Sequence, residues 1–191
     1  MGLERLLFDG PMGLVTARIM AKRNTETERE AVETLAPAPD DAVLAIGFGA
    51  GTGVAELLGR VASVGGVDPS WAMVTVARRR NRGGRVRLER RTADRIPWPD
   101  NSFDGALAVN SIQLWRPLAA SIAEVARVLR PGARLVAFTH DWVVARDEGE
   151  TLEGWLASMT TALETGGFTE VRHWRGESEE GRSIALAARA T

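Results

Sequence analysis

Three glycines alternate in the stretch VLAIGFGAGTG, where a short apolar run gives way to a turn. Gly47, Gly49 and Gly51 allow a chain to turn tightly from strand into helix, and they let a ligand approach the main chain. The G-x-G-x-x-G register of dinucleotide-binding turns fails here. The sixth position is Thr52 when counted from Gly47 and Val54 when counted from Gly49. The spacing therefore favours a nucleoside site over a pyrophosphate site.

A carboxylate follows the next apolar run. Asp68 ends the segment VGGVD, roughly 20 residues after the glycines, which is the spacing at which an acidic side chain meets ribose hydroxyls. One carboxylate accepts hydrogen bonds from two hydroxyls at once. The alternative is a turn used only for close packing, with Asp68 capping the helix that follows. The position of Asp68 favours the nucleoside site.

Apolar runs alternate with helical patterns along the chain, which predicts parallel strands joined by crossover helices. We expect strands over 43–48, 64–68, 85–93, 103–112 and 133–140, and a terminal antiparallel hairpin within 168–190. We expect helices over 14–20, 27–35, 53–61, 69–80, 118–130 and within 147–167. Thr27 followed by Glu30 is a capping-box pattern, and Pro69 suits the first turn of its helix. Ligands of such sheets bind beyond the carboxyl ends of the strands.

Composition narrows the function classes. The chain has 191 residues, which predicts a single domain over 1–191, with a helical cap over 1–36, a binding core over 37–145 and a helix and hairpin over 146–191. It has no cysteine, which excludes disulfides, thiolate metal sites and a cysteine nucleophile, and fits a cytoplasmic location. The apolar runs are too short to span a bilayer, and we predict no signal peptide.

Charge gives no bulk attraction to nucleic acid or membrane, because the formal net charge is -1. The run RRRNRGGRVRLERR, residues 78–91, is the strongest charge feature. We interpret it as a solvated face at the outer edge of the sheet, away from the ligand. An RNA or lipid acceptor is the alternative that this run leaves open.

Four segments in order resemble the motifs of class I S-adenosylmethionine (SAM)-dependent methyltransferases, in the small group similar to UbiE-type and phosphatidylethanolamine N-methyltransferase-like enzymes. They are VLAIGFGAG, GGVDPSWAMVTVARRR, RTADRIPWPDNSFDGALAVNSIQLW and EVARVLRPGARLVAF. GLVTARIMAKRN also resembles the lead-in helix of these enzymes, so the match covers Gly10 to about Asp141. The resemblance implies an α/β, Rossmann-like fold. It has a mostly parallel seven-stranded sheet, a C-terminal antiparallel hairpin and an N-terminal helical lead-in.

The resemblance also implies a SAM site. Asp68 would bind the ribose hydroxyls, Asp94 would accept from the adenine amino group, and Asn110 would lie beside the sulfonium. The glycines would line the methionine and ribose parts, Pro69 and Ser70 would start a helix beside adenine, and Asn24 would cover the site. The complete set of implied cofactor residues is Gly47, Gly49, Gly51, Asp68, Pro69, Ser70, Asp94, Arg95, Asn110 and Asn24.

Ala45 departs from the family pattern. These enzymes usually carry Asp or Glu there, and that carboxylate helps to hold the methionine ammonium of SAM. Ala45 offers no such group. Restoring it with Ala45→Glu should tighten SAM binding. The substitution also motivates an alternative function, a relative that binds SAM or a partner protein without transferring a methyl group.

Methyl transfer from a sulfonium is an in-line displacement, so the protein mainly aligns donor and acceptor. His140 follows the fifth predicted strand and is the candidate base, with Asp141 as its orienter. The alternative is that these residues merely end the strand. Gln113, Trp115 and Trp142 are candidate substrate contacts, with core packing as the alternative for the tryptophans. We predict no metal site.

The sequence thus predicts methyl transfer from SAM to a small-molecule acceptor, with S-adenosylhomocysteine (SAH) as product. A nicotinamide-dependent oxidoreductase is a further alternative, which the missing glycine disfavours. We expect a small-molecule substrate, no nucleic-acid partner and no integral membrane segment. Either the N-terminal helices or the second subunit of a homodimer would cover the pocket.

Overall fold

A computed structural model describes residues 25–141, 151–178 and 182–191 of the chain. The predictions made for Asn24, for the helix over 14–20 and for Trp142 lie outside these residues. Within the described ranges, no helix combines the length and the apolar character needed to cross a membrane.

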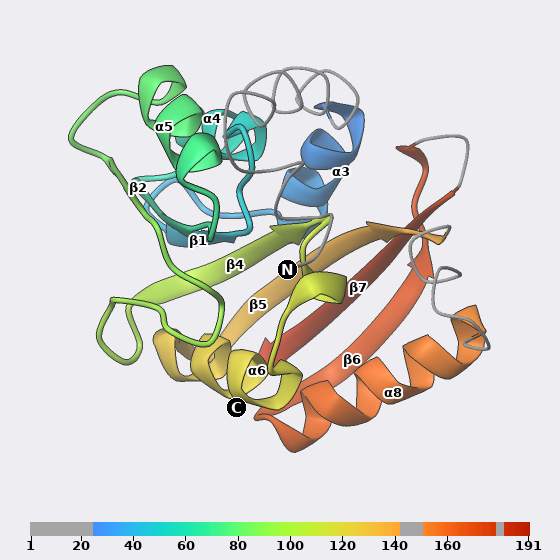
Figure 1. Ribbon diagram of the computed structural model, residues 1–191. Coiled ribbons are helices and arrows are strands. Elements are labelled where there is room, and N and C mark those ends of the chain that lie inside the picture. The colour runs from blue at the N-terminus through green and yellow to red at the C-terminus, as the bar shows by residue number, and fades with distance from the viewer. Residues whose placement is uncertain (1–24, 142–150, 179–181) are drawn as a thin grey trace.

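One seven-stranded sheet runs through the molecule in the order β3-β2-β1-β4-β5-β7-β6 (Figure 1). Neighbours among the first five strands pair in parallel, and β7 lies antiparallel between β5 and β6. The predicted α/β fold, with a mostly parallel sheet and a terminal antiparallel hairpin, is confirmed. The strands are β1 (Ala42–Ile46), β2 (Ser63–Val67), β3 (Val86–Glu89), β4 (Phe103–Val109), β5 (Leu129–His140), β6 (Phe168–Arg175) and β7 (Ser183–Ala190).

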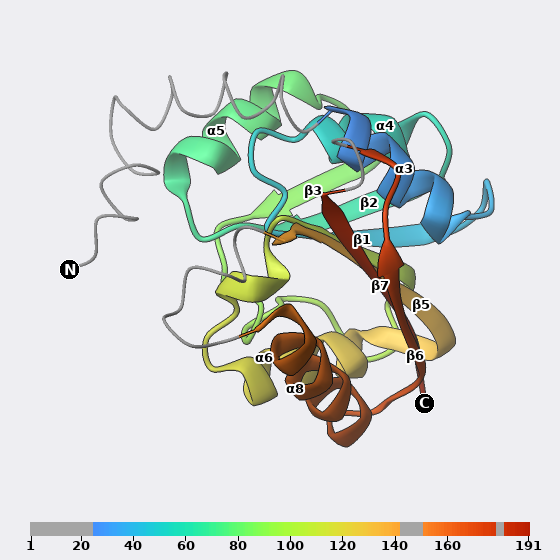
Figure 2. The same cartoon turned by 90° about the vertical axis from the view of Figure 1, so that its right-hand side faces the viewer.

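Helices cover both faces of the sheet (Figure 2). One face carries α3 (Thr25–Leu35), α4 (Thr52–Leu58) and α5 (Trp71–Arg80), and the other carries α6 (Leu118–Val128) and α8 (Leu152–Thr165). A short 3-10 helix, η1 (Ile112–Leu114), follows β4. The parallel order places the ends of β1, β2, β4 and β5 along one edge of the sheet, where ligands of such folds bind.

The sheet separates two hydrophobic clusters. Side chains alternate between the faces of a strand, so Leu44 and Ile46 of β1 join the cluster under α6 and α8, whereas Val43 and Ala45 join the cluster under α3, α4 and α5. Ala45 therefore faces the layer that contains α3. This orientation matters for the site described below.

The strand predicted over 85–93 is shorter in the structure. β3 ends at Glu89, and its only neighbour in the sheet is β2, which ends at Val67 opposite Glu89. Among the described residues, no strand lies beyond that pair to accept further ladder bonds. β4 likewise ends at Val109, before the predicted residue 112, because Asn110 adopts a left-handed φ of 52°.

The boundary between α6 and β5 also differs from the prediction. The helix was expected to run to residue 130 and to stop at Pro131-Gly132, yet it ends at Val128 and β5 begins at Leu129. Leu129 pairs with Phe103, and the register then shifts before Gly105. The Pro-Gly pair thus belongs to an irregular stretch at the start of β5. Within this stretch Gly132 has a left-handed φ of 81°.

The predicted capping box of the first described helix is wrong. α3 already includes Thr25, and Thr27 is buried inside the helix. Glu30 does not reach back to an N-cap, because its carboxylate oxygens accept hydrogen bonds from the backbone N–H groups of Glu177 (2.7 Å) and Ser178 (2.8 Å). Glu30 therefore ties α3 to the segment that follows β6.

Candidate functional site

The glycine turn after β1 has the backbone that its sequence predicts. Gly47, Gly49 and Gly51 all have left-handed φ values, of 67°, 51° and 79°. A Cβ at Gly47 would overlap the side chain of Ser111, whose Oγ donates to the carbonyl of Ile46 at 2.7 Å. At Gly49 no other part of the chain that the structure describes lies within 4 Å of an added Cβ. The turn is thus tight on its inner side and accessible at its tip.

Asp68 connects this turn to the start of α5. Its Oδ2 accepts from the backbone N–H of Gly49 and its Oδ1 from that of Ser70, both at 2.9 Å. These two bonds hold the Asp68 carboxylate between the tip of the glycine turn and the residue that caps α5. Ser70 is the N-cap and α5 begins at Trp71, so Pro69 precedes the helix and does not start it as predicted.

Buried polar atoms lie just beyond β4. Asn110 donates its backbone N–H to the carbonyl of Phe138 at 2.7 Å, but its buried side-chain Oδ1 has no hydrogen-bond partner among the described residues. The same holds for Oε1 of Gln113 and Nε1 of Trp115. An unsatisfied buried polar atom costs about 1–3 kcal/mol, so a ligand that pairs with these atoms would gain that energy. Trp115 packs in the core under α6, which agrees with core packing, the alternative to a substrate contact.

The end of β5 brings His140 to the same edge as Asn110, because β4 and β5 are neighbouring parallel strands with Val109 opposite Phe138. His140 is 6% exposed. Oδ2 of Asp141 accepts from Arg175 of β6 at 3.1 Å. A role of Asp141 in orienting His140 stays a prediction.

The loop between β3 and β4 carries Asp94 and Arg95, which form an ion pair at 3.6 Å. This loop is anchored to α6 by Arg127, which donates to the carbonyl of Ile96 at 3.1 Å and to Oε2 of Glu124 at 2.7 Å. Glu124 in turn accepts from the backbone N–H of Ile96 at 2.9 Å. The hydrogen bond from Arg127 is the main cause that lowers the pKa of Glu124. The loop with Asp94 is therefore held in one place.

Glu28 of α3 is an acidic residue of this site that the sequence motifs do not include. Its carboxyl group lies beside the glycine turn, and a Cβ on Gly53 would overlap its Oε2. Burial raises the pKa of Glu28 to about 8. A sequence signal existed, because Glu28 shares helical spacing with the buried Ala31, Val32 and Leu35. A glutamate that begins the apolar stripe of an amphipathic helix is directed toward the core.

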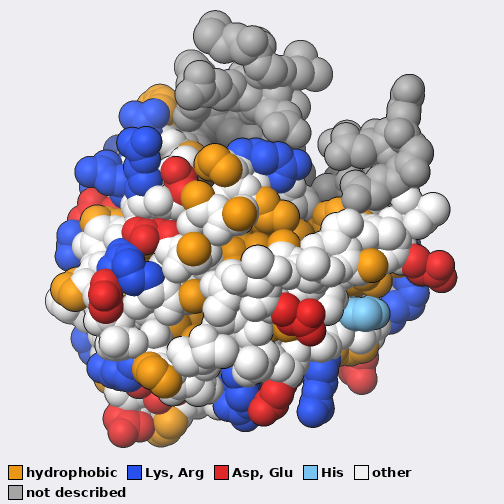
Figure 3. All heavy atoms as spheres, turned by 90° about the horizontal axis from the view of Figure 1, so that it is seen from below, with side chains coloured by type: hydrophobic (Ala, Val, Ile, Leu, Met, Phe, Trp, Pro, Cys, Tyr) orange, Lys and Arg blue, Asp and Glu red, His pale blue; other side chains and the backbone are white. Residues whose placement is uncertain are grey.

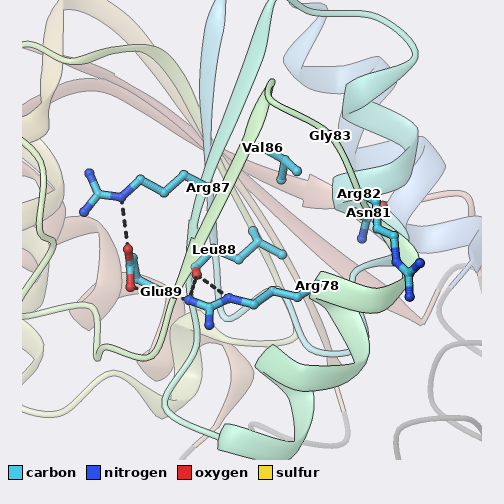
Figure 4. Close-up of a pocket in the computed structure, with 8 residues that line it drawn as sticks. All are labelled: Arg78, Asn81, Arg82, Gly83, Val86, Arg87, Leu88 and Glu89. Carbon is cyan, nitrogen blue, oxygen red and sulfur yellow. Dashed lines mark hydrogen bonds and ion pairs between the residues drawn. The ribbon is translucent and has the colours of Figure 1, made fainter.

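A hollow of about 420 Å³ lies between α5 and the edge strand β3, apart from the glycine turn (Figure 4). Two of its arginines are engaged by the protein: Nε of Arg78 donates to the carbonyl of Leu88 at 2.9 Å, and Nε of Arg87 donates to Glu89 at 3.0 Å. The guanidinium of Arg87 also lies over the ring of Trp98, at 4.6 Å. The position at the sheet edge and these contacts fit the predicted solvated face.

Hydrophobic side chains gather in the middle of the face seen from below in Figure 3, with charged side chains around them. Leu114, the last residue of η1, is 52% exposed, and η1 lies shortly after the end of β4. In the parts of the chain that the structure describes, no group of three or more His, Cys, Asp or Glu side chains is placed to hold a metal ion.

Comparisons with known proteins agree with this geometry. Residues 44–137 match the family model described as a methyltransferase domain. The chain is 36% identical over 134 residues to the O-methyltransferase cnsE of Penicillium expansum, covering 68% of this chain and 48% of that protein. It is 27% identical over 160 residues to the uncharacterized methyltransferase YdaC of Bacillus subtilis, covering 83% of this chain and 88% of that protein. The chain thus spans about half the length of cnsE.

Solved structures share the fold. A SAM-dependent methyltransferase from Aquifex aeolicus superposes with a TM-score of 0.75 at 19% identity, covering 93% of this chain and 98% of that one. The region matched by the family model contains the glycine turn, Asp68, Asp94 and Asn110. It does not include Glu28 or His140.

Proposed function

We propose that this chain, which belongs to the class I SAM-dependent methyltransferases, transfers the methyl group of SAM to a small-molecule acceptor. SAM carries the methyl group on a positively charged sulfur. When the methyl group passes to the acceptor, the neutral thioether SAH is the leaving group. Catalysis then requires the chain to bind the donor, to align an acceptor with it and to exclude water. Alignment alone accounts for up to roughly 7–11 kcal/mol of a barrier.

The observation that carries this proposal is the arrangement at the ends of β1 and β2. Asp68 and the glycine turn are joined by a hydrogen bond, and the tip of the turn at Gly49 is open. Ribose hydroxyls are donors, and a buried carboxylate held by backbone N–H groups is a suitable acceptor. The residues present therefore fit the nucleoside part of SAM. Asp94, on its anchored loop, is the proposed acceptor for the adenine amino group.

We place the acceptor at the ends of β4 and β5. The buried Oδ1 of Asn110 would orient a donor group of the substrate there. His140 is the proposed base that takes a proton on its imidazole from an acceptor that carries one. The relative cnsE is named as an O-methyltransferase, and hydroxyl compounds are therefore the first acceptors to test. Cytoplasmic location and a homodimer stay predictions of the sequence.

Calorimetric titration of the chain with SAM and with SAH tests the proposal. We expect both to bind, and we expect NAD not to bind. No binding of SAM or SAH at high micromolar concentration would overturn the proposal. Binding without SAH formation across a broad panel of hydroxyl, amine and thiol acceptors would instead support the non-catalytic alternative.

A further inference from the structure

The carboxyl group of Glu28 lies between α3 and the glycine turn. It lines a cavity of about 10 Å³ between this helix, β1, the turn and β4. The other lining residues are Ala45, Ile46, Gly47, Phe48, Gly53, Val54, Leu107 and Val109. All of these are apolar residues or glycines, so Glu28 is the single ionisable group among them. Room of this size holds about one water-sized group, and a primary ammonium is of that size.

Gly53 is what gives the carboxyl group its place. This glycine lies in the first turn of α4, and a Cβ there would overlap Oε2 of Glu28. In a helix interior, alanine is otherwise more favourable than glycine by roughly 1 kcal/mol. The glycine at this position thus leaves space for the acid from the neighbouring helix.

The carboxyl group has no cation beside it in the described part of the protein. No hydrogen bond or ion pair of Glu28 occurs there, and burial is the one cause of its raised pKa. The elements packed against α3 also carry His140, at the end of β5, and acidic and arginine side chains with partners of their own. Glu56 of α4 pairs with Arg60, Asp104 of β4 pairs with Arg130, and Arg134 of β5 donates to the carbonyl of Leu35.

A buried carboxylate without a partner is unfavourable, and a small cation that entered the cavity would relieve this. The proposed cofactor carries two positive groups, a sulfonium and an α-ammonium. The sulfonium must stay open to the acceptor and has no hydrogen to donate. The ammonium donates three hydrogen bonds and can sit in an enclosed cavity.

We propose that Glu28 binds the α-ammonium group of SAM, and that it does so from α3 in place of the carboxylate that Ala45 does not supply from β1. The inference rests on the proposed function. Ala45 and Glu28 line the same cavity from opposite sides, one from the strand and one from the helix. In this chain the carboxyl group is therefore supplied by α3, the helix that covers the sheet, and not by β1.

Glu28 also couples binding to proton release. With a pKa of about 8, the ligand-free carboxyl group is protonated at pH 7 in most molecules. Contact with an ammonium favours the ionised form. Binding of SAM or SAH at pH 7 should therefore release most of one proton, roughly 0.9 for a group of that pKa.

Three ligands separate the parts of the cofactor. SAM carries both positive groups, SAH keeps only the ammonium, and 5′-methylthioadenosine lacks the whole amino-acid end. We expect Glu28→Gln to weaken both SAM and SAH by roughly 10- to 100-fold, as for loss of a hydrogen bond to a charged group. Binding of 5′-methylthioadenosine should change less than twofold. Glu33→Gln is the matched control, because Glu33 lies on the same helix with its side chain 57% exposed.

A second variant guards against a folding defect in the first. Gly53→Ala keeps Glu28 but displaces its carboxyl group, and should weaken SAH while leaving 5′-methylthioadenosine and the unfolding midpoint nearly unchanged. Titration of SAH at pH 7 in phosphate and in Tris measures the proton release, because the two buffers differ in ionisation heat. The binding heat of the wild type should differ between the two buffers because a proton is released, and that of Glu28→Gln should not.

The outcomes are distinct. Wild-type chain that binds neither SAM nor SAH refutes the proposed function itself. Wild-type binding with unchanged SAH affinity in Glu28→Gln refutes the role of Glu28 alone. Loss confined to SAM would assign Glu28 to the sulfonium and overturn the inference, and equal loss for all three ligands would show a general structural effect and overturn it too.

Discussion

Glu28→Gln should remove a pH-dependent contribution from the stability of the ligand-free chain. Burial raises the pKa of Glu28 from 4.5 to about 8 in the folded protein. Between these values the folded state holds a proton that the unfolded state has lost. Stability from this group is therefore fully present below pH 4.5 and is lost as the pH rises through 8. The glutamine variant holds no such proton and lacks this dependence.

The magnitude follows from the size of the shift. Each pH unit in the window lowers the wild-type free energy of unfolding by about 1.4 kcal/mol through this group. The whole window from 4.5 to about 8 corresponds to about 5 kcal/mol, an upper limit because solvent screens part of the effect. Between pH 5.5 and pH 7.5 we expect the wild type to lose about 2 kcal/mol relative to Glu28→Gln.

Urea unfolding at pH 5.5, 6.5 and 7.5 and constant ionic strength measures this difference. The wild type and Glu28→Gln are compared at each pH, so titration of all other groups cancels. Glu33→Gln serves as the control, and its difference from the wild type should show no comparable trend because its side chain is 57% exposed. A wild-type–Glu28→Gln difference that does not change with pH would refute the argument that this carboxyl group is buried and protonated.

Three further variants test the site and its support. Asp68→Asn should weaken SAH binding by about 1.5–3 kcal/mol in a calorimetric titration, while Asp40→Asn, on the exposed turn before β1, should not; equal affinities would contradict the ribose assignment. Gly47→Ala should lower stability by about 1–3 kcal/mol, because the new Cβ would overlap Ser111 at a left-handed φ of 67°; wild-type urea stability would contradict this. Arg127→Ala should lower the free energy of unfolding by about 1–3 kcal/mol at neutral pH. That loss should shrink as falling pH protonates its carboxylate partners; a pH-independent loss would argue against the ion pairs.

The layered fold could be predicted because it depends on local patterns. Apolar runs alternating with helical stretches indicate parallel strands and crossover helices, and the structure has both. Strand ends are set by neighbours instead. β3 stops at Glu89 because β2 offers no further partner, and β5 begins early because Leu129 pairs with Phe103. A single sequence contains no signal for such pairings.

The site divides in the same way. Asp68 and the glycine turn lie close in sequence and follow consecutive strands, so their spacing sufficed to predict that they meet. Thr27 and Glu30 match a local capping pattern, but tertiary contacts decide otherwise, since Glu30 binds backbone N–H groups that are distant in sequence. Glu28 meets the glycine turn only because α3 packs on α4 and the sheet.

Ala45 shows how the structure changes an argument made from sequence. Taken alone, a missing carboxylate on β1 implies that Ala45→Glu should restore a contact with the cofactor. In the folded chain Ala45 is buried and faces the cavity that Glu28 already enters. A second acid would share this small space with the first, and two carboxyl groups in one site cannot both ionise readily. We therefore expect Ala45→Glu to destabilise the wild type without tightening SAH, and to recover SAH affinity only together with Glu28→Gln. Tighter SAH binding by Ala45→Glu alone would mean that Glu28 does not supply the missing acid.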